Sequence, residues 1–324
     1  RPIAMSSTNV ITPRSSSRSV PWAAAQPAVA RPSTALTVLV VLILLLAVLA
    51  AGVGVFYGGG GSGPFEFTTV RGDTVTVYGH GIYRYDGADM VAQAIPQDMV
   101  TLVLAVPLLA IALVLYRRGS LRGTFLLAGT LAYFLYTYTV MALGAALNPL
   151  FLVYVALFSL SLYAFIMAML AVDLRALPGA FDDRLPRKTI AGFLFFSAAF
   201  LILAWLGRIV PAQLGGTTPV GMSTSTTLFI QAMDLGVVVP MMVLAAVQLL
   251  QRRPFGYLLT AVAIMKFVTM GLALDAMILG QYFAGVPMTV AEMVIFPIIS
   301  LVAIVMAVIV LKAARQGDSE SGQG

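Results

Sequence analysis

Eight long apolar segments constrain the fold of this chain more than any other feature of its sequence. An apolar helix of about 20 residues is long enough to cross the roughly 30 Å hydrocarbon core of a bilayer. The sequence therefore predicts an all-α polytopic membrane protein with eight transmembrane helices. The segments cover approximately residues 36–56, 98–116, 123–147, 149–172, 189–210, 228–250, 257–280 and 288–312.

Composition agrees with this fold and excludes several kinds of site. Hydrophobic residues make up 60% of the 324 residues and charged residues only 10%, whereas a soluble domain has roughly 25% charged residues. The absence of cysteine excludes disulfides, thiolate metal sites and cysteine nucleophiles. The single histidine, His80, cannot supply the paired ligands of a membrane b-type haem, so no haem is expected and no other cofactor is evident.

Basic residues gather in alternate loops, which predicts the orientation of the chain. Cytoplasmic loops of membrane proteins carry an excess of Lys and Arg. We therefore expect cytoplasmic N- and C-termini in a cytoplasmic membrane of bacterial type, with membrane lipids rather than nucleic acid as partners of the positive charge. The excess of Arg over Lys also favours a bacterial source. The loop and C-terminal residues on this side are Arg117, Arg118, Arg122, Arg175, Arg184, Arg187, Lys188, Arg252, Arg253, Lys312 and Arg315.

The two ends of the chain have the composition of disordered cytoplasmic tails. Residues 1–35 are rich in Ser, Pro, Ala and Arg, and residues 313–324 are short and polar. We expect the first apolar segment to be a retained helix, because it is longer than the core of a usual signal peptide. Cleavage as a signal peptide, with small residues near Ala50, is the alternative.

Residues 57–97 predict a small extracytoplasmic β-ribbon between the first two helices. A glycine-rich hinge at residues 58–63 precedes two stretches of alternating strand-like residues, 74–78 and 82–85. Arg71-Gly72-Asp73 has ordinary turn chemistry and is interpreted as a turn rather than as an adhesion motif.

A parallel internal repeat is the next prediction, with four helices in each copy. Asp, Pro, a pair of arginines and Gly recur in the same order at offsets of about 132 to 138 residues. The copies would be residues 36–172 and 189–312, joined by a cytoplasmic linker at residues 173–188. Transporters with such repeats hold their sites between the copies, whereas chance similarity of apolar helices is the alternative. The matched residues are Asp98 with Asp234, Pro107 with Pro240, Arg117-Arg118 with Arg252-Arg253, and Gly123 with Gly256.

Charges inside the apolar segments mark the candidate functional residues. A charge at bilayer depth is costly, so it usually has a partner or a function. Helix geometry places Lys266 and Asp234 at membrane depths close enough for the flexible lysine side chain to reach the carboxylate. Gln231 lies one helical turn from Asp234. We expect Asp234 and Lys266 to pair, either as a structural salt bridge or as a substrate counter-ion or proton relay.

Further polar residues are predicted to form a layer near the outer surface. Such oxygen-rich groups would suit a hard divalent cation such as calcium or magnesium, or a general acid and base. The alternative is that each acid is solvated or caps its helix, which fits Asp98 best. The residues of the layer are Asp98, Asn148, Gln231, Asp275 and Glu292, and Arg208 is placed to meet one of these acids or an anionic lipid.

Three classes of function fit these features. The first is transport or binding of a small or lipid-like ligand at a polar site between the repeats, open to the outer face. The second is a membrane enzyme with an outward-facing carboxylate site, built from Asp234, Asp275 and Glu292, that acts on a lipid-linked substrate. The third is an accessory or sensory subunit whose ribbon docks onto another membrane protein.

Overall fold

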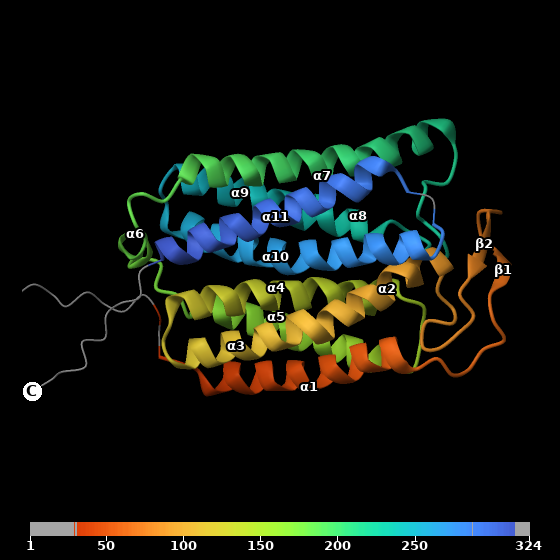
Figure 1. Ribbon diagram of the computed structural model, residues 1–324, viewed down its shortest axis with the longest axis horizontal. Coiled ribbons are helices and arrows are strands. Elements are labelled where there is room, and N and C mark those ends of the chain that lie inside the picture. The colour runs from red at the N-terminus through yellow and green to blue at the C-terminus, as the bar shows by residue number, and fades with distance from the viewer. Residues whose placement is uncertain (1–28, 30, 287, 315–324) are drawn as a thin grey trace, which may run out of the picture.

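The structure is a computed structural model that describes residues 29, 31–286 and 288–314. Within these residues, eight helices are long and apolar enough to cross a membrane. They lie side by side along one axis, with a small two-stranded sheet at one end (Figure 1). The prediction of a helical integral membrane protein is confirmed at this level.

Six of the spanning helices are continuous, and two contain a short π-helical segment. The continuous helices are α1 (Thr34–Phe56), α4 (Leu121–Gly144), α5 (Phe151–Leu170), α7 (Arg187–Gly215), α10 (Pro254–Phe283) and α11 (Val290–Ala313). The second spanning helix joins α2 (Ala88–Val100), η1 (Thr101–Ala105) and α3 (Val106–Arg117), and the sixth joins α8 (Phe229–Met233), η2 (Asp234–Val238) and α9 (Val239–Leu250). The strands are β1 (Phe65–Thr68) and β2 (Thr74–Val77), and α6 (Leu177–Ala180) is a single short turn.

The bundle has two halves, with α1–α5 on one side and α7–α11 on the other (Figure 1). Helices α4 and α10 pack against each other where the halves meet. At this crossing Gly129 lies against Met265 so closely that a Cβ atom on Gly129 would overlap the Met265 side chain. Small residues allow such close approach of membrane helices, whose packing depends on contact rather than on the hydrophobic effect.

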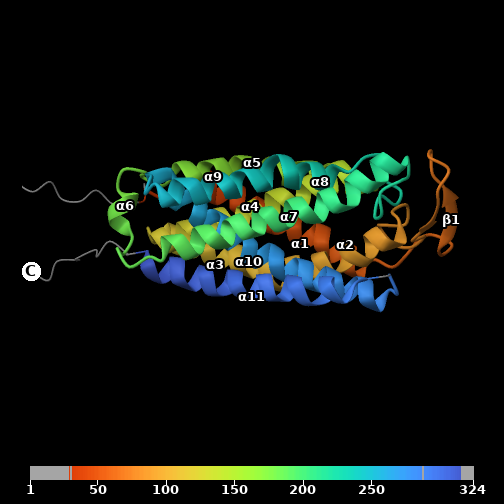
Figure 2. The same ribbon diagram turned by 90° about the horizontal axis from the view of Figure 1, so that it is seen from above.

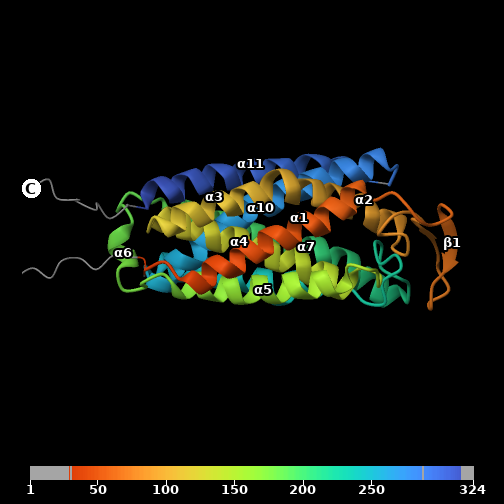
Figure 3. The same ribbon diagram turned by 90° about the horizontal axis from the view of Figure 1, so that it is seen from below.

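The two ends of the bundle are different. One end, the α6 end, holds α6 and the turns that follow α3 and α9, and the other, the ribbon end, holds β1 and β2 (Figures 2 and 3). At the α6 end, the Arg122 side chain donates a hydrogen bond to the carbonyl oxygen of Ala314. The backbone N–H of Asp182 donates to the carbonyl oxygen of Ala313. The start of α1 and the end of α11 therefore lie at the same end of the bundle.

The turns after α3 and α9 have the same backbone geometry. Each places one residue in the left-handed region, Gly119 with a φ of 74° and Arg252 with a φ of 56°. The residue that follows donates its N–H back into the helix, in one case from Ser120 to Leu115 and in the other from Arg253 to Gln248. Such a C-terminal cap satisfies a carbonyl that the helix leaves free.

The π-helical segments η1 and η2 each end just before a proline, Pro107 or Pro240. Proline has no N–H, and its ring collides with the carbonyl four residues earlier in a regular α-helix. A wider turn before the proline relieves this collision. The chain accommodates each proline with a local change of helix type.

The second spanning helix begins about ten residues earlier than the sequence predicted, at Ala88 rather than at Asp98. Pro96 lies inside α2, where Gly280 of α10 packs directly against Pro96 and the carbonyl oxygen of Ala92. Asp98 is therefore in the helix interior, and its interpretation as a cap of a helix start is wrong.

The ribbon is smaller than predicted. Strands β1 and β2 pair antiparallel from Phe65 opposite Val77 to Thr68 opposite Thr74, around the predicted Arg71-Gly72-Asp73 turn. The second predicted strand, residues 82–85, forms turns instead. The Ser/Thr run at residues 223–227 has the residue types of a helix cap, but α8 begins after Leu228 without a side-chain cap, and Ser223 donates to Asp89.

Candidate functional site

Asp234 is the centre of a buried polar cluster that combines both halves of the bundle. Its Oδ1 accepts a hydrogen bond of 2.8 Å from the Tyr136 hydroxyl on α4. Its Oδ2 accepts one of 2.9 Å from the indole N–H of Trp205 on α7. Asp234 is the first residue of η2, so the wider turn lies directly at this carboxylate.

Lys266 completes the cluster from α10, although not by the direct ion pair that the sequence predicted. Its Nζ lies 4.3 Å from the centre of the Tyr136 ring, a distance typical of a cation–π contact. No ion pair within 4.0 Å joins Lys266 to Asp234, both of which the structure describes. The two charges interact electrostatically with Tyr136 between them. One aromatic side chain thus contacts both the buried acid and the buried base.

The cluster continues to the ribbon end through Arg208. The Arg208 guanidinium lies 5.7 Å from the Trp205 ring centre and forms an ion pair with Glu292 at the start of α11. Glu292 also accepts from the backbone and side chain of Thr289 in a capping box. Arg208 therefore meets one of the acids, as the sequence analysis allowed, and both side chains remain partly exposed.

Asp98 is the centre of a second cluster, which contains tyrosines and no cation. It accepts a 2.5 Å hydrogen bond from the Tyr83 hydroxyl, and three more tyrosines interact with it electrostatically. Beside this hydrogen bond, Gly54 of α1 lies so close that a Cβ atom there would overlap the Asp98 carboxyl group. The three further tyrosines are Tyr133 and Tyr138 of α4 and Tyr154 of α5.

The predicted outer layer of acids does not come together as one site. Asp275 interacts with Ser300 of α11, Glu292 with Arg208, and Asp98 with Tyr83. Across the part of the chain that the structure describes, no group of three or more His, Cys, Asp or Glu residues is arranged to hold a metal ion. Of the remaining candidates, Asn148 begins the turn into α5 and lies beside Tyr154, and Gln231 is half-buried in α8.

Two titratable groups in the loop before α2 have shifted pKa values. Burial raises the pKa of Asp86 to about 6, although the N–H of Ala146, which donates to its Oδ1, opposes the shift. Burial raises the pKa of Tyr83 well above its ordinary value. Tyr83 therefore stays a neutral hydrogen-bond donor at physiological pH.

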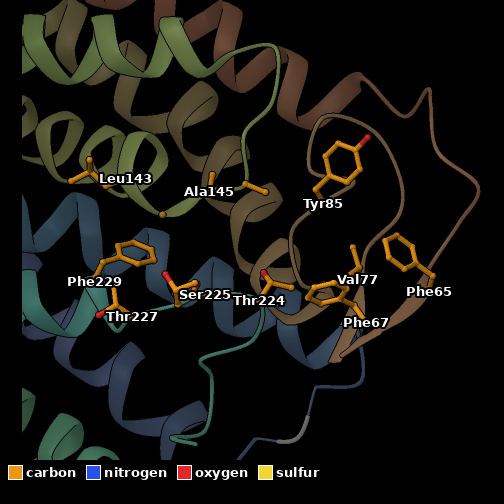
Figure 4. A pocket seen from close by; sticks show the side chains of 13 residues that line it. Phe65, Phe67, Val77, Tyr85, Leu143, Ala145, Thr224, Ser225, Thr227 and Phe229 are labelled. Carbon is orange, nitrogen blue, oxygen red and sulfur yellow. The ribbon is translucent and has the colours of Figure 1, made fainter. Parts of the chain in front are cut away.

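A pocket of about 480 Å³ opens at the ribbon end. It lies between the ribbon, the end of α4 and the loop that leads into α8, so both halves of the bundle contribute to its wall (Figure 4). Aromatic and aliphatic side chains make up most of the wall, and a run of hydroxyl side chains covers one side. The lining residues are Phe65, Phe67, Val77, Tyr85, Leu143, Gly144, Ala145, Ala146, Thr224, Ser225, Thr226, Thr227 and Phe229.

Two arginines lie at the edge of this pocket. Arg71, in the ribbon turn, donates a 2.9 Å hydrogen bond to the carbonyl oxygen of Thr226. Arg84 stacks over the ring of Tyr85 at 4.9 Å. Since Thr226 and Tyr85 both line the pocket, two arginine side chains lie next to this apolar cavity. The Asp86 carboxyl group also lies next to it, because it accepts from the N–H of the lining residue Ala146.

Sequence reasoning missed the aromatic members of both clusters. Trp205 and Tyr83 received no role, and the tyrosines of α4 were expected to pack with hydrogen bonds across helices, or to line a polar cavity, without a link to the buried acids. A usable signal was present, because buried Trp N–H and Tyr O–H groups need hydrogen-bond partners and buried carboxylates are the strongest acceptors. None of the eight candidate residues lines the pocket, which is formed by residues of small or apolar type.

No protein-family model, no curated protein and no solved structure matches the chain.

Proposed function

We propose that the protein binds a small, lipid-like ligand with an acidic head group in the pocket at the ribbon end, between the two halves. This is the transport or binding function expected from the sequence. The observation that carries it is the composition of the pocket, an apolar wall from both halves with Arg71 and Arg84 at its rim. Sites for amphipathic molecules combine an apolar cavity with a few placed polar groups, and arginine suits carboxylate or phosphate groups.

The pocket leads toward the Asp234 cluster. Phe229 lines the pocket at the start of α8, and Asp234 follows it by five residues, or about 7.5 Å along a helix. On α4, Leu143 lines the pocket and Tyr136 lies two turns below it. A ligand that moved deeper would therefore meet the acid and base around Tyr136, which favours transport as the use of the site.

A parallel repeat of four helices per half is part of the proposal. Support comes from the turns, since residues 119 and 252, and residues 123 and 256, differ by the same 133 positions. Gly123 and Gly256 each pack against the backbone of the preceding helix. The same offset relates Thr101 to Asp234 and Tyr133 to Lys266. Each half therefore has a buried polar pair at corresponding positions, and in the first half the hydroxyls of Thr101 and Tyr133 are joined by a hydrogen bond of 2.8 Å.

The proposed orientation places the ribbon end outside a bacterial-type cytoplasmic membrane. The α6 end carries most of the loop arginines, among them Arg118, Arg122 and Arg253, as cytoplasmic loops do. The pocket would then face the outer side, and its ligand would come from the outer leaflet or from outside the cell.

The accessory role is the second candidate, because apolar side chains of the ribbon are exposed. Val70 at the tip of the ribbon is 86% exposed, and Phe65 and Phe67 are nearly half exposed. Such residues would suit contact with another membrane protein. The enzyme hypothesis has less support, because its three carboxylates interact with separate partners, Asp234 with Tyr136, Asp275 with Ser300 and Glu292 with Arg208.

Native mass spectrometry of the protein, extracted gently from its own membrane, tests the proposal. Ala145→Trp fills the pocket, and Leu147→Trp is the matched control, since Leu147 is 74% exposed and does not line it. We expect an acidic amphiphile to accompany the wild type and Leu147→Trp but not Ala145→Trp.

Two outcomes oppose the binding function. Retention of the amphiphile by Ala145→Trp would place the ligand elsewhere. A stoichiometric protein partner without any small ligand would favour the accessory role.

A further inference from the structure

Asp98 is a buried carboxyl group without a counter-ion. Only 4% of its surface is exposed, and it lies in the interior of a membrane helix. No ion pair within the described residues involves it. Asp234 in the other half differs, because Lys266 lies close enough to interact with it electrostatically.

The groups that face Asp98 are neutral phenols from three elements. Tyr83 from the loop before α2 donates to it, and the hydroxyl of Tyr133 on α4 is taken by Thr101. The Tyr138 hydroxyl, also on α4, is buried without a hydrogen-bond partner and interacts electrostatically with Asp98. Tyr154 approaches from α5, and Gly54 of α1 packs against the carboxyl group.

An ionised carboxylate in these surroundings would be costly. Burying an unpaired charge costs several kcal/mol, and such groups commonly take up a proton or a cation instead. The contact with Gly54 leaves little room beside the carboxyl group for a hydrated ion. We propose that Asp98 is a proton-binding site, reached from the ribbon end through Tyr83 and Tyr154.

A line of polar groups connects this site to the ribbon end. The Tyr83 hydroxyl interacts with that of Tyr154, which is buried and makes no full hydrogen bond in the described structure. Tyr154 in turn neighbours Asn148 and interacts electrostatically with Asp86. A proton arriving from Asp86 or water would bind one tyrosine hydroxyl as that hydroxyl releases its own proton to the next group. In the last transfer the Tyr83 O–H bond breaks as the O–H bond on Asp98 forms, and Tyr83 receives a proton from the Tyr154 side. Each tyrosine thus ends neutral, and the net change is one proton moved from Asp86 or water to the Asp98 carboxylate.

Infrared spectroscopy of the full chain in lipid nanodiscs tests the site, whether or not the pocket binds a ligand. We expect a protonated carboxyl C=O band at neutral pH that shifts in D₂O and is lost in Asp98→Asn. Tyr83→Phe should keep the band and raise its frequency, because one hydrogen bond to the carboxyl group is lost. Asp183→Asn, at an exposed position, is the control and should leave the band unchanged.

Three results would overturn the proposal. A spectrum that is the same in wild type and Asp98→Asn would mean that Asp98 is ionised. Loss of the band on addition of Na⁺ or K⁺ would make the site a metal-cation site. If Asp98→Asn does not fold, an unchanged band frequency in Tyr83→Phe would overturn the proposal instead, because the band would then not come from Asp98.

The route is tested separately by the rate at which the band shifts after transfer to D₂O. We expect slower exchange in both Tyr154→Phe and Asp86→Asn than in wild type. Equal rates in all three proteins would overturn the route.

Discussion

The two buried aspartates differ in how their charge is compensated. Asp234 has Lys266, Tyr136 and Trp205 around it, whereas the neighbours of Asp98 are tyrosines. Removing one partner of a buried charge pair is much more destabilising than removing both, because the remaining charge is left alone in an apolar medium. The difference makes the Asp234 cluster testable by paired substitutions.

Lys266→Met should destabilise the protein by about 3–5 kcal/mol, since Asp234 would lose its nearby positive charge. The double variant Lys266→Met with Asp234→Asn should recover most of this loss. Thermal unfolding in detergent, followed for wild type, both single variants and the double variant, gives the coupling free energy. Additive effects of the two substitutions would contradict the proposed electrostatic interaction across Tyr136.

Asp86 should make stability depend on pH. Its pKa is about 6 in the folded protein, above the roughly 3.9 of an unfolded chain, so the folded state holds the proton more tightly. The stabilisation is complete below about pH 4 and is lost as pH rises to about 6, a decline of up to about 3 kcal/mol.

Asp86→Asn should remove this decline, because an amide does not titrate between pH 4 and pH 7. The local structure should be kept, since the amide oxygen can still accept from the N–H of Ala146. The measurement is the unfolding temperature of the variant and the wild type between pH 4 and pH 7. The same slope in both proteins would show that another group titrates.

At the scale of elements, glycine and proline decide how the helices begin, end and approach one another. The turns after α3 and α9 have one backbone geometry, although one has Gly119 and the other Arg252 at the left-handed position. A side chain costs about 1–2 kcal/mol in that region, and glycine does not. Close approach of helices likewise depends on glycine, as Gly129 and Gly280 show.

Arg252→Gly should therefore stabilise the protein by about 1 kcal/mol, and Gly119→Ala should destabilise it by a similar amount. Unfolding temperatures of the two variants in the same detergent check this pair. Gly179→Ala is a suitable control, since Gly179 has a negative φ and nothing within 4 Å of the position of a Cβ atom. Destabilisation by Arg252→Gly would mean that the arginine side chain makes a stabilising contact.

At the scale of the whole molecule, the proposed orientation follows from the distribution of charge. The ribbon end and the α6 end should face opposite sides of the membrane. The chain has no cysteine, so one introduced cysteine reports one position. Val70 at the ribbon tip and Gln251 in the turn after α9 are both exposed.

Val70→Cys should react with a membrane-impermeant maleimide in intact cells, and Gln251→Cys only after the membrane is opened. Labelling of both variants after opening is the control for reactivity. The reverse pattern would place the arginine-rich end outside and turn the pocket toward the cytoplasm.

The sequence by itself determined that the chain forms eight long apolar helices and a small ribbon. Helix length, apolar composition and turn residues such as Arg71-Gly72-Asp73 act over short distances along the chain, so they are visible without a structure. The start of α2 could not be predicted in this way, because Pro96 normally favours a break, and only the packing of Gly280 against it shows how the helix continues.

Only the tertiary structure decided which polar groups meet. Tyr136 and Asp234 are 98 positions apart in the chain, and no local pattern places the tyrosine between Asp234 and Lys266. The pocket likewise needs the ribbon, the end of α4 and the loop before α8 in one place. Such contacts depend on which face each helix turns toward its neighbours, and that follows from side-chain packing across the whole bundle.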